Sequence, residues 1–350
     1  LQAMKSHIIL LLYIVVRSVS GQLDDHQDPI LSDGYKPSKI HVKQDGRHQP
    51  KYYNYEPPCP DAEDIAPCVC TYDTVLNAMD LNCSAVESEE QLKQIFKADF
   101  PFKNFRKIHI EHNNNLKVLE AGVFNGISFE EIQISFTDLE VVELHALDSC
   151  YETATDLHLY YNKITSFPFD ELSQFSKLRD FDISNNLLSV VPADAFHGLT
   201  ALEYLDIGAN NADIVGTFQD LPNLLRIYLD SNNITTTISA QFIKTGSSHL
   251  SYINLYNNNI VSVEPGAFDI VDWLDINMYG NSLSTLDEAT WRPHLEAGGT
   301  LDAGVNPLMC GCDIAWLFAE DYLLWQVDYN AMCTDGEFMY ELDPKMFDLC

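Results

Sequence analysis

The amino-acid sequence predicts an α/β solenoid, in which each repeat of the chain contributes one short strand to a parallel sheet. Three observations support this prediction: one pattern recurs along most of the chain, it keeps a single register, and cysteines cluster on both sides of it. The clearest copy is LRDFDISNNLLSVVPADAFHGLT, residues 178–200. Because one copy is too small to bury its own apolar face, neighbouring copies must stack to form a core.

Each copy follows the pattern L-x-x-F-x-I-x-x-N-x-L. Leu178, Phe181 and Ile183 suit a short strand, and Asn186 lies at the following turn, where its amide can hydrogen-bond buried backbone groups. The turn position returns at intervals of about 20 to 29 residues. Its members are Asn113, Thr137, Asn162, Asn186, Asn210, Asn232, Asn258, Asn281 and Asn306. This is the signature of a leucine-rich repeat horseshoe, with a parallel concave sheet and disulfide caps expected at both ends.

The repeats predict where the strands and the outer layer lie. Strand segments begin at Phe105, Phe129, Ala154, Leu178, Leu202, Leu224, Leu250 and Trp273, and a shortened ninth begins at Leu301. Strands about 4.8 Å apart would make a sheet on the order of 40 Å long. A second apolar residue recurs in most repeats and should pack the outer layer rather than form a cofactor pocket: Phe124, Leu147, Leu172, Phe196, Phe242, Phe268 and Trp291. Phe218 comes early, and the spacing around Asn232 and Asn258 is uneven, so repeats five and six are predicted to have irregular outer segments.

Composition and charge restrict the class of partner. The chain has 350 residues, of which 46% are hydrophobic, and this would allow one or two ordinary domains. The repetition favours a single elongated solenoid instead. The formal net charge is −32, from 52 acidic and 20 basic residues. Such a charge argues against nucleic acid or an anionic membrane as the partner and favours a surface that attracts cations.

The first residues have the features of a secretory signal peptide. Lys5 precedes an apolar run over residues 8–16, and the small residues Ser18 and Ser20 follow it, so we expect a signal peptide over residues 1–21. A membrane anchor is the alternative, but the run is shorter than the roughly 20 apolar residues that a spanning helix needs. The mature chain is therefore expected to be secreted and extracellular.

Residues 22–58 are expected to form a disordered polar arm. Acidic and basic residues nearly balance there, and apolar periodicity is absent, as in HVKQDGRHQPKYYNYEPP. His26, His41 and His48 are candidate metal ligands, but their spacing is wide. We interpret them as solvated histidines of the arm, since metal sites use closer ligand spacings.

The cysteines bracket the repeats. Four precede the first repeat and four follow the last, with only Cys150 between them: Cys59, Cys68, Cys70 and Cys83, then Cys310, Cys312, Cys333 and Cys350. In an oxidising compartment such clusters close the ends of a solenoid, whereas zinc binding by the same residues would need a reducing one. Disulfide-held caps are expected over residues 59–104 and 306–350, around repeats at 105–305; the pairing within each set stays open.

Both clusters resemble a known family. CPDAEDIAPCVC with Cys83 resembles the amino-terminal cap of extracellular leucine-rich repeat proteins, and NPLMCGCDIAWL with Cys333 and Cys350 is similar to their carboxy-terminal cap. The resemblance implies four pairs, with Cys150 left as a free thiol or an intermolecular link: Cys59 with Cys70, Cys68 with Cys83, Cys310 with Cys333, and Cys312 with Cys350. Within this superfamily, residues 58–150 resemble arthropod proteins named after the non-catalytic subunit of Oplophorus-type luciferase. That likeness implies a subunit that associates with a partner and stabilises it.

The stretch DIAWLFAEDYLLWQVDY within the second cluster has apolar residues at helical spacing. It predicts a cap helix whose Trp316, Leu317, Leu323 and Leu324 face the last repeat. A membrane-binding helix is the alternative, and the acidic residues in the stretch argue against it.

Motifs of catalysis are missing from the sequence. It contains no H-E-x-x-H, no G-x-S-x-G and no phosphate-binding glycine loop, and Cys150 has no evident partner base. We therefore expect a protein-binding chain that is not an enzyme and uses no cofactor; an extracellular-matrix or cell-surface adhesion component acting alone is the alternative. Sequons at Asn233 and Asn82 predict N-glycosylation, with Asn82 the weaker because Cys83 should be bridged.

Residues that point outward from the predicted strands supply the candidate binding face. They are rich in tyrosine and aspartate: Tyr160, Tyr161, Asp180, Asp182, Tyr204, Asp206, Tyr228, Asp230, Tyr252, Tyr256 and Tyr279. Tyrosine gives a large contact area at low entropic cost, and clustered carboxylates steer a basic partner. We expect this face to bind a basic protein surface. A solvated acidic surface, or a weak calcium site built from the same carboxylates, is the alternative, and no dedicated metal site is predicted.

Overall fold

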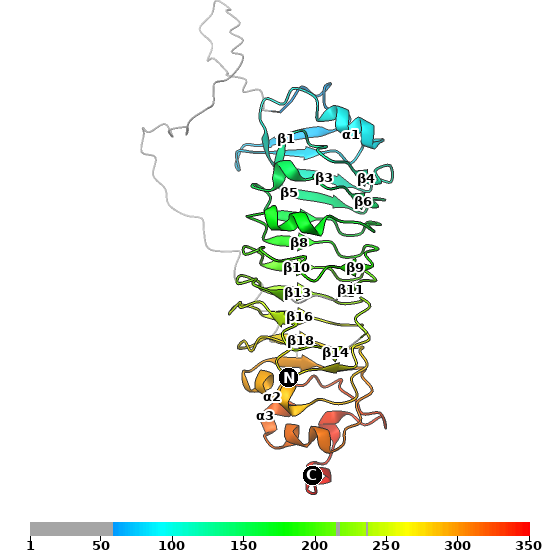
Figure 1. Ribbon diagram of the computed structural model, residues 1–350, viewed down its shortest axis with the longest axis vertical. Helices are drawn as coiled ribbons and strands as arrows, with labels where there is room; N and C mark the ends of the chain where they lie inside the picture. The colour runs from blue at the N-terminus through cyan, green and yellow to red at the C-terminus, as the bar shows by residue number, and fades with distance from the viewer. Residues whose placement is uncertain (1–58, 215–217, 236) are drawn as a thin grey trace, which may run out of the picture. The chain divides into compact units, whose positions relative to one another are not determined.

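The computed structural model describes residues 59–214, 218–235 and 237–350 (Figure 1). The predicted signal peptide and polar arm, with His26, His41 and His48, lie outside the described residues. The described chain forms an eleven-stranded open sheet, in which β1 and β2 pair antiparallel and all later neighbours pair parallel. In spatial order the strands are β1 (Val69–Asp73), β2 (Ala78–Asn82), β3 (Asn104–Glu111), β5 (Ser128–Ser135), β7 (Asp156–His158), β8 (Asp180–Asp182), β10 (Tyr204–Asp206), β13 (Arg226–Tyr228), β16 (Tyr252–Asn254), β18 (Asp275–Asn277) and β19 (Thr300–Asp302).

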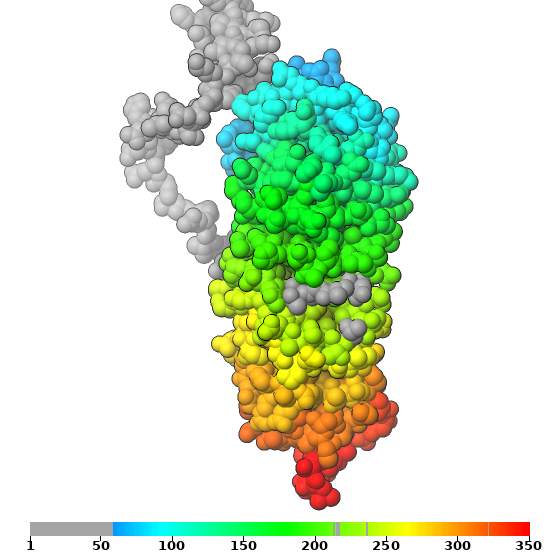
Figure 2. All heavy atoms as spheres, in the orientation of Figure 1, coloured from blue at the N-terminus to red at the C-terminus, as the bar shows by residue number. Residues whose placement is uncertain are grey.

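The solenoid prediction is confirmed. Each of the nine predicted segments contains one strand of the sheet, β3 to β19. The colour changes steadily along the stack in Figure 2, because each repeat lies against the repeats before and after it. Contacts between successive repeats are what hold a solenoid together.

The opposite side of the stack is built from short strand pairs and helical turns rather than long helices. The pairs are β4 (Val118–Leu119) with β6 (Val141–Val142), β9 (Val190–Val191) with β11 (Asp213–Ile214), β12 (Phe218–Gln219) with β15 (Ile243–Lys244), and β14 (Thr237–Ile238) with β17 (Ser262–Val263). The 3-10 turns η2 (Asp148–Cys150) and η3 (Phe169–Gln174), and the helix α2 (Glu288–Glu296), occupy other repeats.

The core lies between these two sides. In the three-residue strands the middle side chain is buried and its two neighbours point outward, as strand alternation requires. The predicted outer-layer residues are all buried. Phe218 lies between Phe196 and Phe242, with ring centroids 5.6 Å from each, so it completes the outer layer despite its early position in the sequence.

The asparagines at the predicted turn positions form a buried hydrogen-bonded ladder. The Asn186 amide donates to the carbonyls of Leu159 at 2.8 Å and Ile183 at 3.0 Å, and its Oδ1 accepts from the backbone N–H of Ile164 at 2.9 Å. Asn210 and its successors repeat this scheme. Each asparagine thereby satisfies backbone groups of two repeats that strands cannot satisfy, and the ladder fixes the register between repeats.

The residue before each ladder position adopts a positive φ, which turns the chain out of the strand. These residues are His112, Phe136, Tyr161, Asn185, Ala209, Ser231, Asn257, Gly280 and Val305. A left-handed conformation costs a non-glycine residue roughly 1–2 kcal/mol. The ladder hydrogen bonds offset this cost, and the turn leaves the rings of Phe136 and Tyr161 exposed by 41% and 51%.

Disulfides close both ends. The pairs Cys59–Cys70, Cys68–Cys83, Cys310–Cys333 and Cys312–Cys350 are those that the family resemblance implied, and all four are confirmed. In the first cap, helix α1 (Glu89–Ile95) begins after Ser88, whose hydroxyl accepts the backbone N–H of Gln91 at 3.2 Å. Leu92 and Ile95 of this helix are buried against the first repeats.

Cys150 is unpaired and fully buried. Burial raises the pKa of its thiol to about 11, so it is protonated at neutral pH. An intermolecular link through this sulfur would require the repeat to open. A buried free thiol is therefore the form that the structure supports.

The prediction of one continuous cap helix is wrong. The stretch forms the 3-10 helix η4 (Cys312–Phe318) and, after a break, the short helix α3 (Asp321–Leu324). Trp316, Leu317 and Leu323 are nevertheless buried as predicted, while Leu324 is partly buried, and the Trp316 indole donates to the Leu286 carbonyl at 3.0 Å. The 3-10 turns η5 (Met339–Glu341) and η6 (Pro344–Phe347) complete the cap.

Trp273 also departs from the prediction. The repeat pattern puts it at the first buried position of its strand segment, but its side chain is 77% exposed and Leu274 is buried in its place. Trp273 has a positive φ of 62°, and in this left-handed conformation its indole faces solvent rather than the core. Within the described ranges, none of the helices combines the length and apolar character that crossing a membrane requires.

Candidate functional site

The inner face carries two columns of outward side chains, set by the register of the parallel strands. One column runs Asp156, Asp180, Tyr204, Arg226, Tyr252, Asp275 and Thr300. The other runs His158, Asp182, Asp206, Tyr228, Asn254, Asn277 and Asp302. Residues that are about one repeat apart in sequence thus become neighbours across strands, at the spacing of cross-strand pairs.

The predicted tyrosines lie on this face but form three groups rather than one. Tyr228 lies between Tyr204 and Tyr252, with ring centroids 5.2 and 5.4 Å away. Tyr256 stacks on Tyr279 just beyond the strand ends, with centroids 5.5 Å apart.

The third group lies just after β7, two strands from β10 with Tyr204. Tyr161 stacks on Phe136 with ring centroids 4.8 Å apart, and Tyr160 meets the same ring edge-on at 5.6 Å. Phe136 in turn stacks on His112 at 5.3 Å. Tyr160 and Tyr161 therefore belong to an aromatic ridge near the strand ends, separate from the central tyrosines.

The central aspartates are crowded and half-buried. Burial and the charge of Asp182 raise the pKa of Asp206 to about 7, and burial also raises the pKa of Asp182 and Asp230. Asp182 accepts a hydrogen bond from the Ser184 amide at 2.9 Å, Asp206 from the Gly208 amide at 2.8 Å, and Asp230 from the Asn254 side chain at 2.9 Å. Among the described residues none of the three forms a salt bridge. When ionised, these three carboxylates therefore carry negative charge that no salt bridge among the described residues balances.

A small hollow lies at the starts of β10, β13 and β16. It measures about 290 Å³ and is lined by Glu203, Tyr204, Leu225, Arg226 and Ser251. This volume is at the low end of the roughly 300–1,000 Å³ of small-molecule sites. The open strands around it offer a surface suited to contact with a protein.

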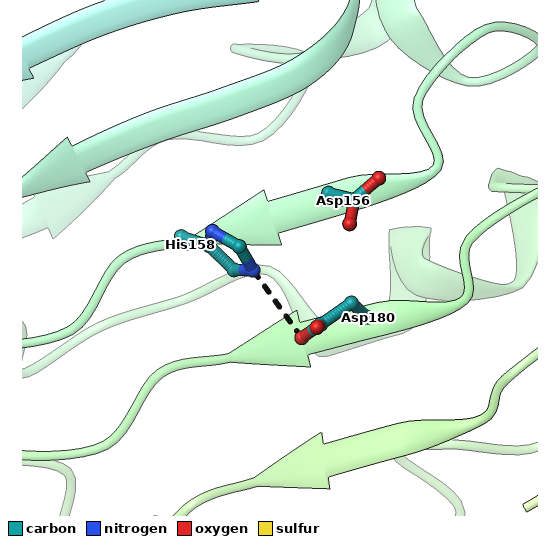
Figure 3. A group of neighbouring side chains, drawn as sticks. All are labelled: Asp156, His158 and Asp180. Atoms are coloured by element: carbon teal, nitrogen blue, oxygen red, sulfur yellow. Dashed lines mark ion pairs between the residues drawn. The ribbon is translucent and has the colours of Figure 1, made fainter. Parts of the chain in front are cut away.

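One cluster on this face includes a residue that sequence reasoning missed. Figure 3 shows Asp156 and His158 on β7 and Asp180 on the neighbouring β8, with His158 Nε2 3.3 Å from Asp180 Oδ1. Burial alone would lower the pKa of His158, but Asp180, Asp182 and Asp156 raise it above its ordinary value. The imidazolium thus offsets part of the negative charge.

One ligand atom from each of these three residues lies within 4.8 Å of the others, so the cluster has the donor types of a divalent-cation site. The ion pair already accounts for the arrangement. The sequence could have identified His158, because it occupies the same outward strand position as Asp182 in the preceding repeat.

The amino-terminal strands of the same sheet differ in charge. Arg106 pairs with Asp80 and also with Glu131 at 3.1 Å, while Lys107 lies 3.8 Å from Glu131. Acidic and basic groups therefore neutralise one another on β2, β3 and β5, whereas the acidic excess is concentrated from β7 to β13. Arg226 is the exposed basic residue in the central columns, and sequence reasoning missed it too.

The two sequons lie on the surface. Asn233 is exposed just past the ladder position Asn232, and Asn82 is exposed at the end of β2. The Asn82 side chain accepts the Ser84 amide at 2.9 Å, and the neighbouring Cys83 is bridged as expected. Glycosylation at both positions stays a prediction.

A stacked parallel sheet, a buried asparagine ladder and disulfide-bonded ends define a capped leucine-rich repeat protein. The family model for the leucine rich repeat matches residues 152–211 and 176–234. Over 315 residues the chain is 31% identical to the Oplophorus-luciferin 2-monooxygenase non-catalytic subunit of Oplophorus gracilirostris, covering 83% of this chain and 87% of that protein. The chain belongs to the family of that subunit.

More distant relatives share the repeats. Identity is 33% over 204 residues with podocan of Mus musculus, covering 55% of this chain, and 29% over 184 residues with lumican of Gallus gallus, covering 51%. The chain spans only 32% of podocan and 51% of lumican.

Two solved structures share the fold. The TLR13–ssRNA13 complex aligns with a TM-score of 0.54 and 26% identity, over 64% of this chain and 31% of that one. The octameric complex of Latrophilin 3, Unc5D and FLRT2 (LRR) aligns with a TM-score of 0.56 and 24% identity, over 69% of this chain and 76% of that one.

Proposed function

We propose that the mature chain is a secreted, non-catalytic protein that binds a basic partner protein through the central inner face. One observation supports the proposal: Asp182, Asp206 and Asp230 are crowded on an open sheet, and none of the three forms a salt bridge among the described residues. Burial, together with the charge of Asp182, raises the pKa of Asp206 to about 7 and makes the ionised folded state less stable at neutral pH. Strained ionisable groups cluster at functional sites, because a ligand relieves the strain.

A basic partner would relieve this strain directly. Lysine or arginine side chains placed against Asp182, Asp206 and Asp230 would replace repulsion with attraction, and the affinity would fall with added salt. The paired charges on β3 and β5 offer no such gain. The partner is therefore expected to dock over β8 to β16 rather than over the amino-terminal strands.

The tyrosines supply the contact area. Tyr204, Tyr228 and Tyr252 run beside the aspartates and are half-buried against one another, so little side-chain entropy is left to lose on binding. Aromatic side chains of this kind dominate binding energy at protein interfaces. Aspartates that steer and tyrosines that anchor are complementary parts of one binding face.

The printed name of the relative supports a subunit role. A chain that covers most of a protein named a non-catalytic subunit is proposed to associate with a partner and to stabilise it. An extracellular-matrix or cell-surface adhesion component acting alone is the second candidate, and the similarity to podocan and lumican favours it. Secretion is supported by the four disulfides and by the signal peptide predicted over residues 1–21.

The test is affinity purification of the tagged, secreted chain from extracellular fluid of its source, compared with a Tyr204→Ala, Tyr228→Ala, Tyr252→Ala variant. A stoichiometric basic protein should be recovered with the parent and lost with the variant, while secretion and melting temperature persist. Recovery should fall as salt rises from about 0.05 to 0.5 M, because screening shortens the range of the charges.

A matched control removes exposed apolar side chains elsewhere. Leu187→Ala with Val190→Ala and Val261→Ala deletes comparable surface away from the inner columns and should retain the partner. Equal recovery by the parent and the tyrosine variant would contradict the inner-face proposal. A matrix-bound pool without a stoichiometric companion would favour the second candidate.

A further inference from the structure

A hollow lies where the last strands meet the carboxy-terminal cap. Its volume is about 1020 Å³. The sheet side is lined by Tyr252 of β16, Asp275 of β18 and Asp302 of β19, and the cap side by residues that follow α3. A volume near 1,000 Å³ lies at the upper end of the roughly 300–1,000 Å³ typical of ligand sites, so this hollow admits more than one side chain.

The cap side is an exposed aromatic wall. Trp325 is 87% exposed and Tyr329 is 76% exposed, although Leu323 and Val327 between and beside them are buried. Burial of those neighbours fixes the short segment against the last repeat and holds the two rings outward. Among the described residues neither ring stacks on another aromatic ring. Tyr340, 51% exposed, extends the wall. Large exposed aromatics at the edge of a hollow mark binding surfaces.

The hollow is acidic and has no basic lining. Asp275, Asp302 and Asp328 line it, and none of its described lining residues is lysine, arginine or histidine. Asp302 Oδ1 accepts the Gly304 amide at 3.0 Å, and Asp328 Oδ1 accepts the Asn330 amide at 3.1 Å. The Asn330 side chain also hydrogen-bonds the Asp302 carboxyl group, so Asp302 and Asp328 are joined through Asn330 at the edge of the hollow.

Two further observations agree with a cationic, hydrogen-bonding ligand. Burial and the nearby charge of Asp328 raise the pKa of Asp302. Gln326 also lines the hollow, and its side-chain oxygen is buried without a hydrogen-bond donor among the described residues. A buried acceptor without a donor is unfavourable, and a rotation of the Gln326 side chain toward the hollow would let a ligand N–H satisfy it.

We infer that this hollow binds an arginine side chain presented by an extended segment of the partner protein. The planar guanidinium stacks on Trp325 or Tyr329 while its N–H groups reach the carboxylates and the Gln326 oxygen. A lysine ammonium carries the same charge, but it lacks the planar shape and the fixed set of N–H donors of a guanidinium, so it binds less tightly. The size of the hollow accommodates the flanking residues of the segment. This inference rests on the proposed function in taking the partner to be a basic protein, and adds which side chain anchors it and where.

The test uses the ¹⁵N indole signals of the full chain, which has four tryptophans. Tryptophan-to-phenylalanine variants assign the signals, and the probe is a blocked pentapeptide with arginine at its centre and glycine elsewhere. The Trp325 signal should shift and saturate, whereas that of Trp273, exposed but outside the hollow, should not. The same peptide with citrulline keeps the shape without the charge and should cause at least a fivefold smaller shift.

Variants identify the groups that bind. Asp302→Asn together with Asp328→Asn keeps both side-chain oxygens that accept backbone amides, so the cap should fold, and peptide affinity should fall at least fivefold. Trp325→Ala should reduce it similarly when the shift is followed on backbone amides of β19. Equal shifts at Trp273 and Trp325 would mean general attraction to an acidic chain, and equal shifts with citrulline would mean an apolar groove. Either result, or no shift at all, overturns the inference.

One other occupant is testable in the same spectra. Residues 22–58 contain a single arginine, Arg47. If Arg47→Gln moves the Trp325 signal before any peptide is added, the hollow is taken by this chain's own arm and the inference of a partner segment is wrong.

A second set of variants distinguishes failure of this inference from failure of the proposed function. Loss of the natural partner from Tyr204→Ala with Tyr228→Ala, but not from Trp325→Ala, would reject the anchor and keep the inner face. Neither tyrosine lines the hollow, so peptide binding by that double variant tests the hollow alone.

Discussion

Replacing Asp206 by asparagine should stabilise the protein, and the gain should grow with pH. Asp206 is half-buried between Asp182 and Tyr228 in the outward column, and its Oδ1 accepts the Gly208 amide at 2.8 Å. Asparagine has nearly the same volume and keeps an acceptor oxygen for that amide. Asp206→Asn therefore removes the charge while leaving the contacts in place.

The magnitude follows from the pKa. Burial and the charge of Asp182 raise the pKa of Asp206 from 3.8 to about 7, so between these values the folded protein holds a proton that the unfolded chain releases. The contribution to stability is full below pH 3.8 and is lost as the pH rises through 7. Three pKa units at about 1.4 kcal/mol each correspond to roughly 4 kcal/mol. The variant should gain about 1.5 kcal/mol at pH 5 and about 4 kcal/mol at pH 8.

The assay is urea unfolding of both proteins from pH 5 to 8, with the difference between them as the readout. The difference matters because other groups also titrate. His158, with a raised pKa, loses its contribution as the pH rises, whereas buried His294, with a lowered pKa, loses its contribution as the pH falls. Both remain in the variant. Asp194→Asn, at an exposed position away from the inner columns, is the control and should change stability by less than about 0.5 kcal/mol. A gain that does not grow with pH would refute the crowding argument.

Four shorter predictions concern the ladder, the caps and the surface. Asn210→Ala should cost about 1–3 kcal/mol in urea unfolding, because a buried backbone amide loses its acceptor, whereas the exposed Asn223→Ala should cost less than about 0.5 kcal/mol. Cys333→Ser should cost about 2–5 kcal/mol and lower secretion. Cys150 should resist iodoacetamide until the chain unfolds, since burial raises its thiol pKa to about 11; labelling of the native protein would contradict this. Glycosidase treatment of secreted protein should lower its mass through Asn233, and an Asn233→Gln variant should abolish most of that change.

The sequence predicted the repeating parts of the fold because each repeat is specified locally. An apolar strand position and a turn asparagine recur together in each repeat. The Asn186 amide donates to Leu159 of the preceding repeat and to Ile183 of its own, so the turn asparagine links the repeats that the apolar positions pack together. The disulfide pairing came from family resemblance rather than from spacing, since spacing alone left it open.

The departures have local physical causes. Trp273 occupies a buried position of the pattern, but its positive φ turns it outward, and the sequence carries no clear sign of this. The cap stretch has helical periodicity, yet it breaks between η4 and α3, where bridged Cys312 holds one side and packing against the last repeat holds the other. Propensity of a short segment is easily overridden by such constraints.

The sequence predicted many residues of the candidate site but not how they are grouped in space. Outward positions on the strands identified the tyrosines and aspartates, but grouping them required the register. Asp156, His158 and Asp180 meet because the strands pair Asp156 with Asp180, and the aromatic ridge at Phe136 exists because a turn residue with positive φ faces outward. The hollow at the cap depends on where Trp325 and Tyr329 are placed by a fold that no repeat pattern describes.

The central face and the cap hollow are close enough for one partner segment to occupy both. From β10, with Tyr204, to β19, with Asp302, the sheet advances four strands, or about 19 Å at roughly 4.8 Å per strand. An extended segment covers that distance in about six residues at roughly 3.3 Å each. Tyr252 belongs to the central tyrosines and also lines the hollow, so no barrier of unrelated residues separates the two. When two contacts are made by one segment, binding at the second becomes intramolecular, and weak contacts combine into a tight complex. A single arginine that binds the hollow with a Kd in the millimolar range would then be enough for the whole face to bind its partner with a Kd of about micromolar.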